Sequence, residues 1–231
     1  MSLQNALQKA RKILKNVQTD IKATHASTPG KVYELVCLAE VVQQLQALGF
    51  AVKFKSGHSK VKFKASPGPV NHAYPSFEVT PPNGPGLELW TDVEFLTLSH
   101  ERGGVSDLSK CYELDLALTE KIKNGHRPRH DQIVLGVECK ARSSGLKDTI
   151  KQVLGVRREL SFIAYGESRL CELAGESKAI AANPQVSSGS YIQTSEFCTI
   201  GTVQTILASR SIICRHRLVC AGKGTGTSPP D

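Results

Sequence analysis

Residues 111–118, CYELDLAL, and residues 133–142, IVLGVECKAR, decide the fold of this chain. Each reads as a β-strand, because side chains alternate between the two faces of a strand. Glu138, Lys140 and Arg142 share one face of the second stretch. The apolar run before them predicts a central strand that is buried on both faces. Charges at the end of such a strand tend to lie at a functional site.

The first stretch places an aspartate beside this group. Leu114, Leu116 and Leu118 are expected to face the core, which turns Asp115 to the opposite side. An aspartate next to Glu-x-Lys on a neighbouring strand can hold a divalent cation and a water molecule beside a phosphate. These two strands therefore point to phosphate chemistry more directly than any other part of the sequence.

A further alternating segment, residues 87–98, offers competing carboxylates. It carries Asp92 and Glu94, and its strand could adjoin Glu138 in place of the strand that carries Asp115. We favour Asp115 because its apolar neighbours are better placed, but Asp92 or Glu94 stays open as the metal ligand.

The N-terminal part of the chain reads as two helices. Residues 2–23 carry apolar residues at spacings of three and four and a basic opposite face, which predicts a helix packed on the domain or in a dimer interface. A second helix begins at Thr28-Pro29, with Thr as cap and Pro in the first turn, and ends at Gly49. Glu34 lies on its apolar stripe. That placement is unusual, because burying an unpaired polar group costs about 2–7 kcal/mol.

The remaining elements follow from turn residues and periodicity. We expect strands at 50–54 and 61–64, loops at 66–86 and 99–110, a helix at 146–163, a strand at 179–182, a helix at 197–209 and a strand at 211–220.

Composition narrows the class of protein. The chain has 231 residues and a net charge of +8, which suits a polyanionic partner. Its seven cysteines are scattered and form no CxxC pair, which is typical of reduced thiols. The spacing of Cys214, His216 and Cys220 is not that of a standard zinc site. We expect no membrane span and no signal peptide, and hence a cytoplasmic protein.

The helix with Glu34, the two opening strands and the helix with Gln152 together resemble the PD-(D/E)xK nuclease superfamily, which has the restriction-endonuclease-like fold. The opening helix is especially similar to that of archaeal Holliday-junction resolvases, through Tyr33-Glu34 and Gly49-Phe50-Ala51-Val52. The chain departs from the pattern in having Leu114 where the motif has Pro, and in the long interval from Asp115 to Glu138.

The resemblance covers residues 30–165 and implies an α/β fold. We expect a single domain over residues 1–220, with a central mixed β-sheet flanked by helices. Additional strands and an N-terminal helix would come from family-specific segments, and the tail is expected to be disordered. These segments are residues 1–27, 60–110 and 166–220, and the tail is residues 221–231.

The resemblance also implies a metal-dependent nuclease acting on DNA, in restriction, defence or repair. Mg²⁺, with Mn²⁺ as a substitute, would be bound by Asp115, Glu138 and the backbone carbonyl of Cys139, with Glu34 in the outer shell. Lys140 would stabilise negative charge, because a lysine of ordinary pKa, about 10.4, is a poor base at neutral pH. Gln152 would help to fix the lysine or the phosphate.

The expected nucleic-acid contacts come from Arg142, Lys147 and Lys151. RNA stays open as a substrate. Two other functions remain alternatives: a nucleic-acid-binding module of the same fold without catalysis, and a Holliday-junction resolvase, which would require a homodimer.

Overall fold

The computed structural model describes part of the chain: residues 3–17, 29–55, 66–104, 107, 110–141, 155–156, 158–160, 162–167, 169–175, 179–183 and 187–193. The elements expected at 61–64, 197–209 and 211–220, and the tail at 221–231, lie outside these residues. None of the helices in the described ranges is long and apolar enough to cross a membrane.

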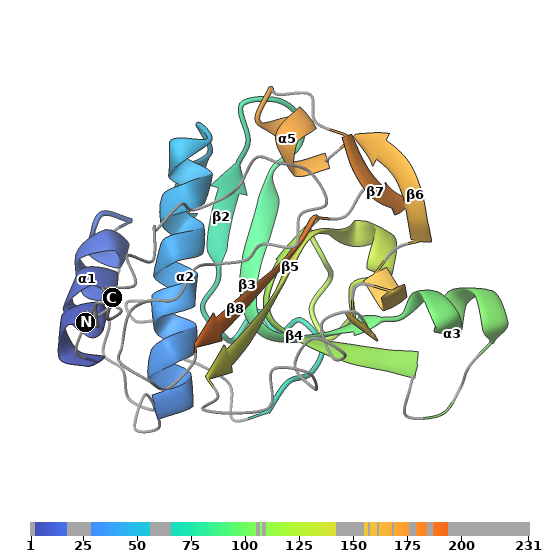
Figure 1. Cartoon of the computed structure of the whole chain (residues 1–231), viewed down its shortest axis with the longest axis horizontal. Coiled ribbons are helices and arrows are strands. Elements are labelled where there is room, and N and C mark those ends of the chain that lie inside the picture. The colour runs from blue at the N-terminus through green and yellow to red at the C-terminus, as the bar shows by residue number, and fades with distance from the viewer. Residues whose placement is uncertain are drawn as a thin grey trace, which may run out of the picture.

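The described residues form an α/β fold with a large sheet, a small two-stranded sheet and several helices (Figure 1). The helical elements are α1 (Leu3–Lys15), α2 (Pro29–Ala47), α3 (Leu98–Gly103), the 3-10 turn η2 (His130–Gln132) and α5 (Arg169–Leu173). The strands are β1 (Ala51–Phe54), β2 (Phe77–Thr80), β3 (Leu87–Leu96), β4 (Cys111–Thr119), β5 (Ile133–Ala141), β6 (Phe162–Glu167), β7 (Ala179–Asn183) and β8 (Ser187–Gln193).

The large sheet has the order β1-β2-β3-β4-β5-β8 in the described chain. Strands β1 to β5 are antiparallel to their neighbours, and β8 runs parallel to β5 at the edge. The expectation of a mixed sheet is therefore wrong for the five strands β1 to β5, which are antiparallel throughout, and the one parallel pair lies at the edge. The reason lies in the connections: loops that join consecutive strands give antiparallel pairs, whereas a parallel pair needs a longer crossover.

Helix α2 lies between α1 and the sheet (Figure 1). It is therefore buried on more than one side, and Leu35, Leu38 and Leu45 are fully buried in the larger apolar core. Burying each such side chain stabilises the fold by about 1.5–3 kcal/mol. Helix α1 contributes Ala10 and Leu14 to this core, which confirms the expected packing helix.

A second core lies on the other face of the sheet and contains Trp90, Phe95 and Ile133. Residues 155–156 and 158–160 are helical, inside the helix expected at 146–163, and supply Val156 and Leu160 to this core. Strand β5 is thus buried on both faces, as its apolar run predicts.

The regular alternation expected for β4 is wrong at Asp115. Leu116 and Leu118 belong to the core that α2 covers, but Leu114 belongs to the second core. There it lies against Gly136, where a β-carbon would come within 3.1 Å of Leu114 side-chain atoms. The facing strand switches at the corresponding point, since Leu89 lies in the first core and Val93 in the second.

Two short elements fall in segments that we expected to be loops. Strand β2 lies within residues 66–86, and α3 begins at Leu98, the last residue of the expected strand, and continues into residues 99–110. Helix α3 begins after Thr97, whose side chain accepts a hydrogen bond from the backbone N–H of His100, and ends at Gly104 with a φ of 63°. Such a cap and a left-handed glycine are ordinary helix boundaries.

Replacing Gly136 by valine tests the close packing between β5 and the second core. A β-carbon at Gly136 would lie 3.1 Å from Leu114 and Leu160, so we expect a loss of about 1–3 kcal/mol in the free energy of unfolding. Urea denaturation measures it. Gly86→Ala is the control, because its β-carbon would meet only the Lys121 side chain, at 3.8 Å. Unchanged or greater stability of Gly136→Val would contradict the packing.

Candidate active site

Asp115 lies where the pairing of β4 with β5 ends. The last backbone pair of that ladder on this side is Leu116 with Val137, and Asp115 is the preceding residue of β4. Its side chain is buried, and its carboxylate accepts a hydrogen bond from the backbone N–H of Cys139. The carboxylate therefore binds a β5 amide just beyond the last backbone pair, which fixes its position against β5.

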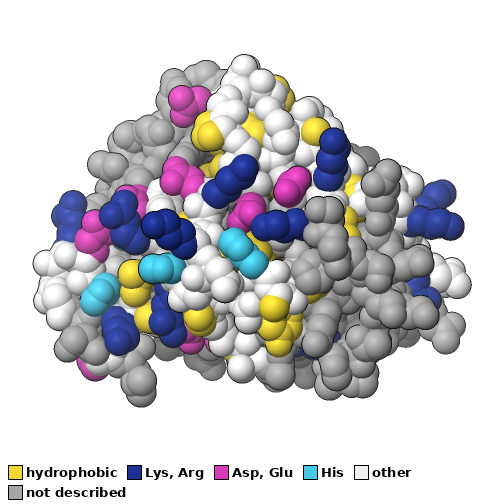
Figure 2. Space-filling model, turned by 180° about the vertical axis from the view of Figure 1, so that it is seen from behind, with side chains coloured by type: hydrophobic (Ala, Val, Ile, Leu, Met, Phe, Trp, Pro, Cys, Tyr) yellow, Lys and Arg dark blue, Asp and Glu magenta, His cyan; other side chains and the backbone are white. Residues whose placement is uncertain are grey.

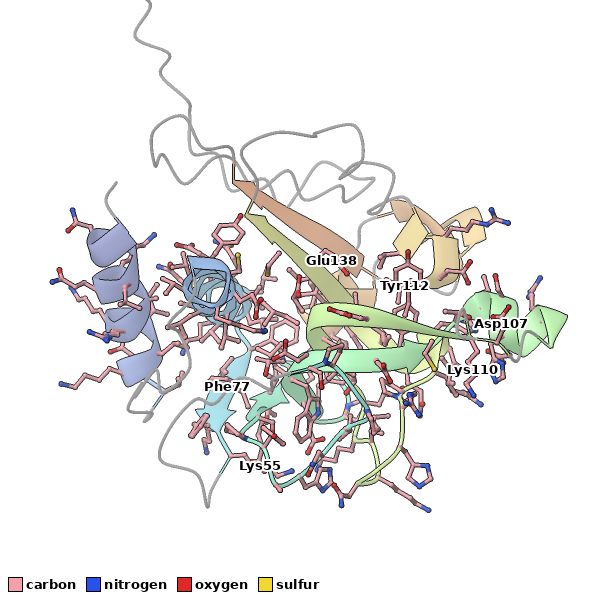
Figure 3. The ribbon with its side chains drawn as sticks, turned by 90° about the horizontal axis from the view of Figure 1, so that it is seen from below. Lys55, Phe77, Asp107, Lys110, Tyr112 and Glu138 are labelled. Atoms are coloured by element: carbon pink, nitrogen blue, oxygen red, sulfur yellow. The ribbon has the colours of Figure 1, made fainter. Side chains whose placement is uncertain are left out.

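Glu138 is the residue of β5 that follows Val137, so continuing the register places it across from Asp115. It is 6% exposed, and Asp115 is 8% exposed. Figure 3 labels Glu138 on β5 and Tyr112 near the beginning of the neighbouring β4. The strand beside β5 is thus the one that carries Asp115, while β3, with Asp92, lies on the far side of β4.

Glu34 projects from α2 into the same region. The pKa of Glu34 is raised to about 7, chiefly by burial; the bond and charge of Lys31 lower it in part, and the negative charges of Asp92 and Asp115 add to the rise. This electrostatic coupling indicates that the helix carboxylate and the two strand aspartates lie close together. A carboxylate half-ionised near neutral pH is typical of functional sites.

Asp92 is part of this group, although its strand does not adjoin β5. The β3–β4 register runs from Thr91 with Leu116 to Val93 with Leu114, which sets Asp92 across from Asp115. Asp92 is 5% exposed and has a φ of 52°, the one positive φ of a described residue other than glycine. Such a conformation costs about 1–3 kcal/mol and tends to persist at functional sites. It coincides with the point where both strands switch faces.

Lys31 bridges two of these carboxylates. Its ammonium donates hydrogen bonds of 2.7 Å to Glu34 Oε2 and of 2.7 Å to Asp92 Oδ1. The bonds and charges of these partners raise the pKa of Lys31, although burial acts in the opposite direction and is the largest single influence. Lys31 is therefore cationic at neutral pH and ties α2 to β3.

Cys139 packs against α2 through its side chain. Burial raises the pKa of its thiol well above the usual value, and the neighbouring Cys37 of α2 raises it further. Both cysteines are free and buried. A thiol that stays protonated is a poor metal ligand and a poor nucleophile, so the side chain serves packing.

The side chains of several predicted site residues lie outside the described part of the structure. Lys140 lies on β5, where its backbone pairs with Ile192 of β8, but its side chain is outside the described part of the structure. The same holds for all of Gln152 and for the three expected nucleic-acid contacts, Arg142, Lys147 and Lys151. Their roles remain predictions.

Two residues of the site were not recognised in their actual roles from the sequence. Lys31 gave no signal beyond its position three residues before Glu34, one helical turn away. The sequence offers Asp92 only as an alternative to Asp115, whereas the structure places the two across from each other on β3 and β4. Glu94, the other alternative, instead forms a 2.7 Å ion pair with Arg127.

The chemistry of the donor set suits a hard cation. Carboxylates from α2, β3 and β4 converge, and an ammonium ion already lies between Glu34 and Asp92. Mg²⁺ prefers such oxygen ligands. As the described side chains stand, however, no three His, Cys, Asp or Glu residues are arranged to hold a metal ion.

The surface charge is mixed on the face seen in Figure 2, where basic side chains alternate with acidic ones. Ion pairs between the described residues include Lys55 with Glu88 and Arg127 with Glu94. The net charge of +8 therefore does not by itself locate a nucleic-acid surface.

Comparisons with known protein families, with curated proteins and with solved structures gave no match.

Replacing Glu34 by glutamine tests the burial of its carboxylate. The folded-state pKa of Glu34 is about 7, against an ordinary value of 4.5. The folded state therefore prefers the protonated form of Glu34. The contribution of protonated Glu34 to the free energy of unfolding is complete below pH 4.5 and is lost as the pH rises through 7. We expect the stability of the unmodified protein, relative to Glu34→Gln, to fall across this window in urea titrations. A constant difference would contradict the raised pKa.

Replacing Asp92 by asparagine tests the coupling between the carboxylates. Removing the Asp92 charge should lower the pKa of Glu34 from about 7. Lys31 would then pair with Glu34 alone, which lowers the pKa of Glu34 further. Desolvation remains, so the midpoint should stay above 4.5. Carboxyl ¹³C NMR titration measures it, with Glu40→Gln on the same helix as the control. An unchanged titration midpoint of Glu34 would show that Asp92 is not coupled to Glu34.

Proposed function

We propose that this chain is a metal-dependent nuclease of the PD-(D/E)xK type that hydrolyses phosphodiester bonds in DNA. One observation carries the proposal. Asp115 and Glu138 are buried on the neighbouring strands β4 and β5, where the ladder between those strands ends, and Asp115 is electrostatically coupled to Glu34 of α2. Buried carboxylates at the end of a central strand are costly and are typical of sites that bind cations.

The order of the elements supports the same proposal. Helix α2 with Glu34 comes before β4 with Asp115 and β5 with Glu138, and helical residues at 155–156 and 158–160 follow β5. We propose that these elements form a restriction-endonuclease-like core. Helix α1, strands β2 and β3, and the segment that carries α5, β7 and β8 would be additions to that core.

Different residues of the chain would bind the metal and stabilise the negative charge. Asp115 and Glu138 would bind Mg²⁺ or Mn²⁺ together with the carbonyl of Cys139, and Glu34 would bind its outer water shell. The bound metal would activate a water molecule and neutralise the phosphate. The Cys139 N–H holds Asp115 in place for this role, and Lys140 would stabilise the developing negative charge.

The decisive experiment is cleavage of plasmid, linear and single-stranded DNA with Mg²⁺ or Mn²⁺. We expect Asp115→Asn, Glu138→Gln and Lys140→Ala each to lower the cleavage rate by about 10²-fold or more, because each removes charge from the reacting phosphate or its metal. Glu78→Gln is the matched control, since Glu78 is an exposed carboxylate on β2, away from this group. Circular dichroism checks that each variant folds.

The outcomes separate the alternatives. Cleavage that survives Asp115→Asn would refute this site. DNA binding without cleavage under any metal condition would favour a non-catalytic binding module. Strong preference for four-way junctions by a dimer would identify a resolvase, and RNA cleavage would change the substrate class.

A further inference from the structure

The Lys31 ammonium lies between two of the buried carboxylates, beside the strand that carries Asp115. Its ammonium lies 2.7 Å from an oxygen of Glu34 and 2.7 Å from an oxygen of Asp92. Asp92 in turn lies across from Asp115 in the sheet. The positive charge is carried into the group on a flexible four-carbon side chain from the first turn of α2.

Carboxylates that share a buried region repel one another unless a cation lies between them. The side chains of Glu34 and Asp92 are only 13% and 6% exposed, so solvent screens them little. A divalent cation and the Lys31 ammonium would repel each other in the same space. The lysine side chain is 25% exposed, which gives the ammonium a route to solvent.

We propose that Lys31 is a tethered counter-ion of this site, which holds Glu34 and Asp92 together before the metal binds and gives way to the metal when it arrives. The inference rests on the proposed function, because it assumes that the carboxylates bind a divalent cation. Lys31 is then a positioning residue that sets metal affinity.

Exchange of this kind predicts opposite effects for two substitutions. Lys31→Gln removes the competing charge at similar length, so Mn²⁺ should bind about five- to tenfold more tightly. Lys31→Arg keeps the positive charge on a guanidinium group, which can bind carboxylates in a bidentate manner. Because the carboxylates would hold this group more firmly than an ammonium, Mn²⁺ should bind about threefold more weakly. In EDTA, Lys31→Gln should also melt at a lower temperature, and Mn²⁺ should restore more of its stability than it adds to the unmodified protein.

The experiment is a Mn²⁺ titration of the full chain at pH 8.5, in which electron paramagnetic resonance measures the concentration of free Mn²⁺. Lys9→Gln is the matched control, because Lys9 forms a similar 2.6 Å ion pair with another glutamate of α2, Glu40. Its Mn²⁺ affinity should not change. Asp115→Asn, which removes a proposed ligand, should bind Mn²⁺ much more weakly.

The results distinguish the two proposals. If the unmodified protein binds Mn²⁺ through Asp115 but Lys31→Gln binds no more tightly, the counter-ion role is refuted and the nuclease proposal stands. If the unmodified protein binds no Mn²⁺, both are refuted. Should Lys31→Gln fail to fold, Lys31→Arg decides, because unchanged or tighter binding by that variant contradicts exchange.

Discussion

Burying several carboxylates between α2 and the sheet is the constraint on which the arrangement of this protein depends. An ionised carboxylate taken out of water costs several kcal/mol unless it is paired and hydrogen-bonded. Asp115 is stabilised by a backbone amide of β5, and Glu34 and Asp92 by one lysine. Polar contacts therefore tie α2 to β3 and β4 to β5, and the apolar cores on both faces of the sheet provide the stability that such contacts require.

The main elements of the fold were predictable because their signals are local. Pro29 and Gly49 mark the ends of α2, and the apolar run before Glu138 marks β5 as a central strand; both strands that carry Asp115 and Glu138 were expected and are neighbours. Strand β2 was not predicted, because it is four residues long and its flanks are rich in Pro and Gly. Its pairing with β1 and β3 stabilises an extended conformation that its own sequence does not specify.

The site was predictable only in part, for a different reason. Asp115 and Glu138 could be assigned to neighbouring strands from alternation, but the switch of faces at Asp92 and Asp115 breaks that alternation and moves Leu114 to the second core. A positive φ at Asp92 and a lysine that bridges a helix and a strand are set by tertiary contacts. The periodicity of the sequence therefore predicts neither the conformation of Asp92 nor the bridge.

The chain positions of the site residues have a consequence for synthesis. Lys31 and Glu34 emerge from the ribosome before Glu138 and the parallel partner strand of β5, and contacts between such distant positions form slowly. Until β5 is made, Asp115 lacks the amide of Cys139 that holds it. A nascent chain that ends before β5 would therefore carry α2 and an antiparallel meander, but its buried carboxylates would lack the strand that orders them.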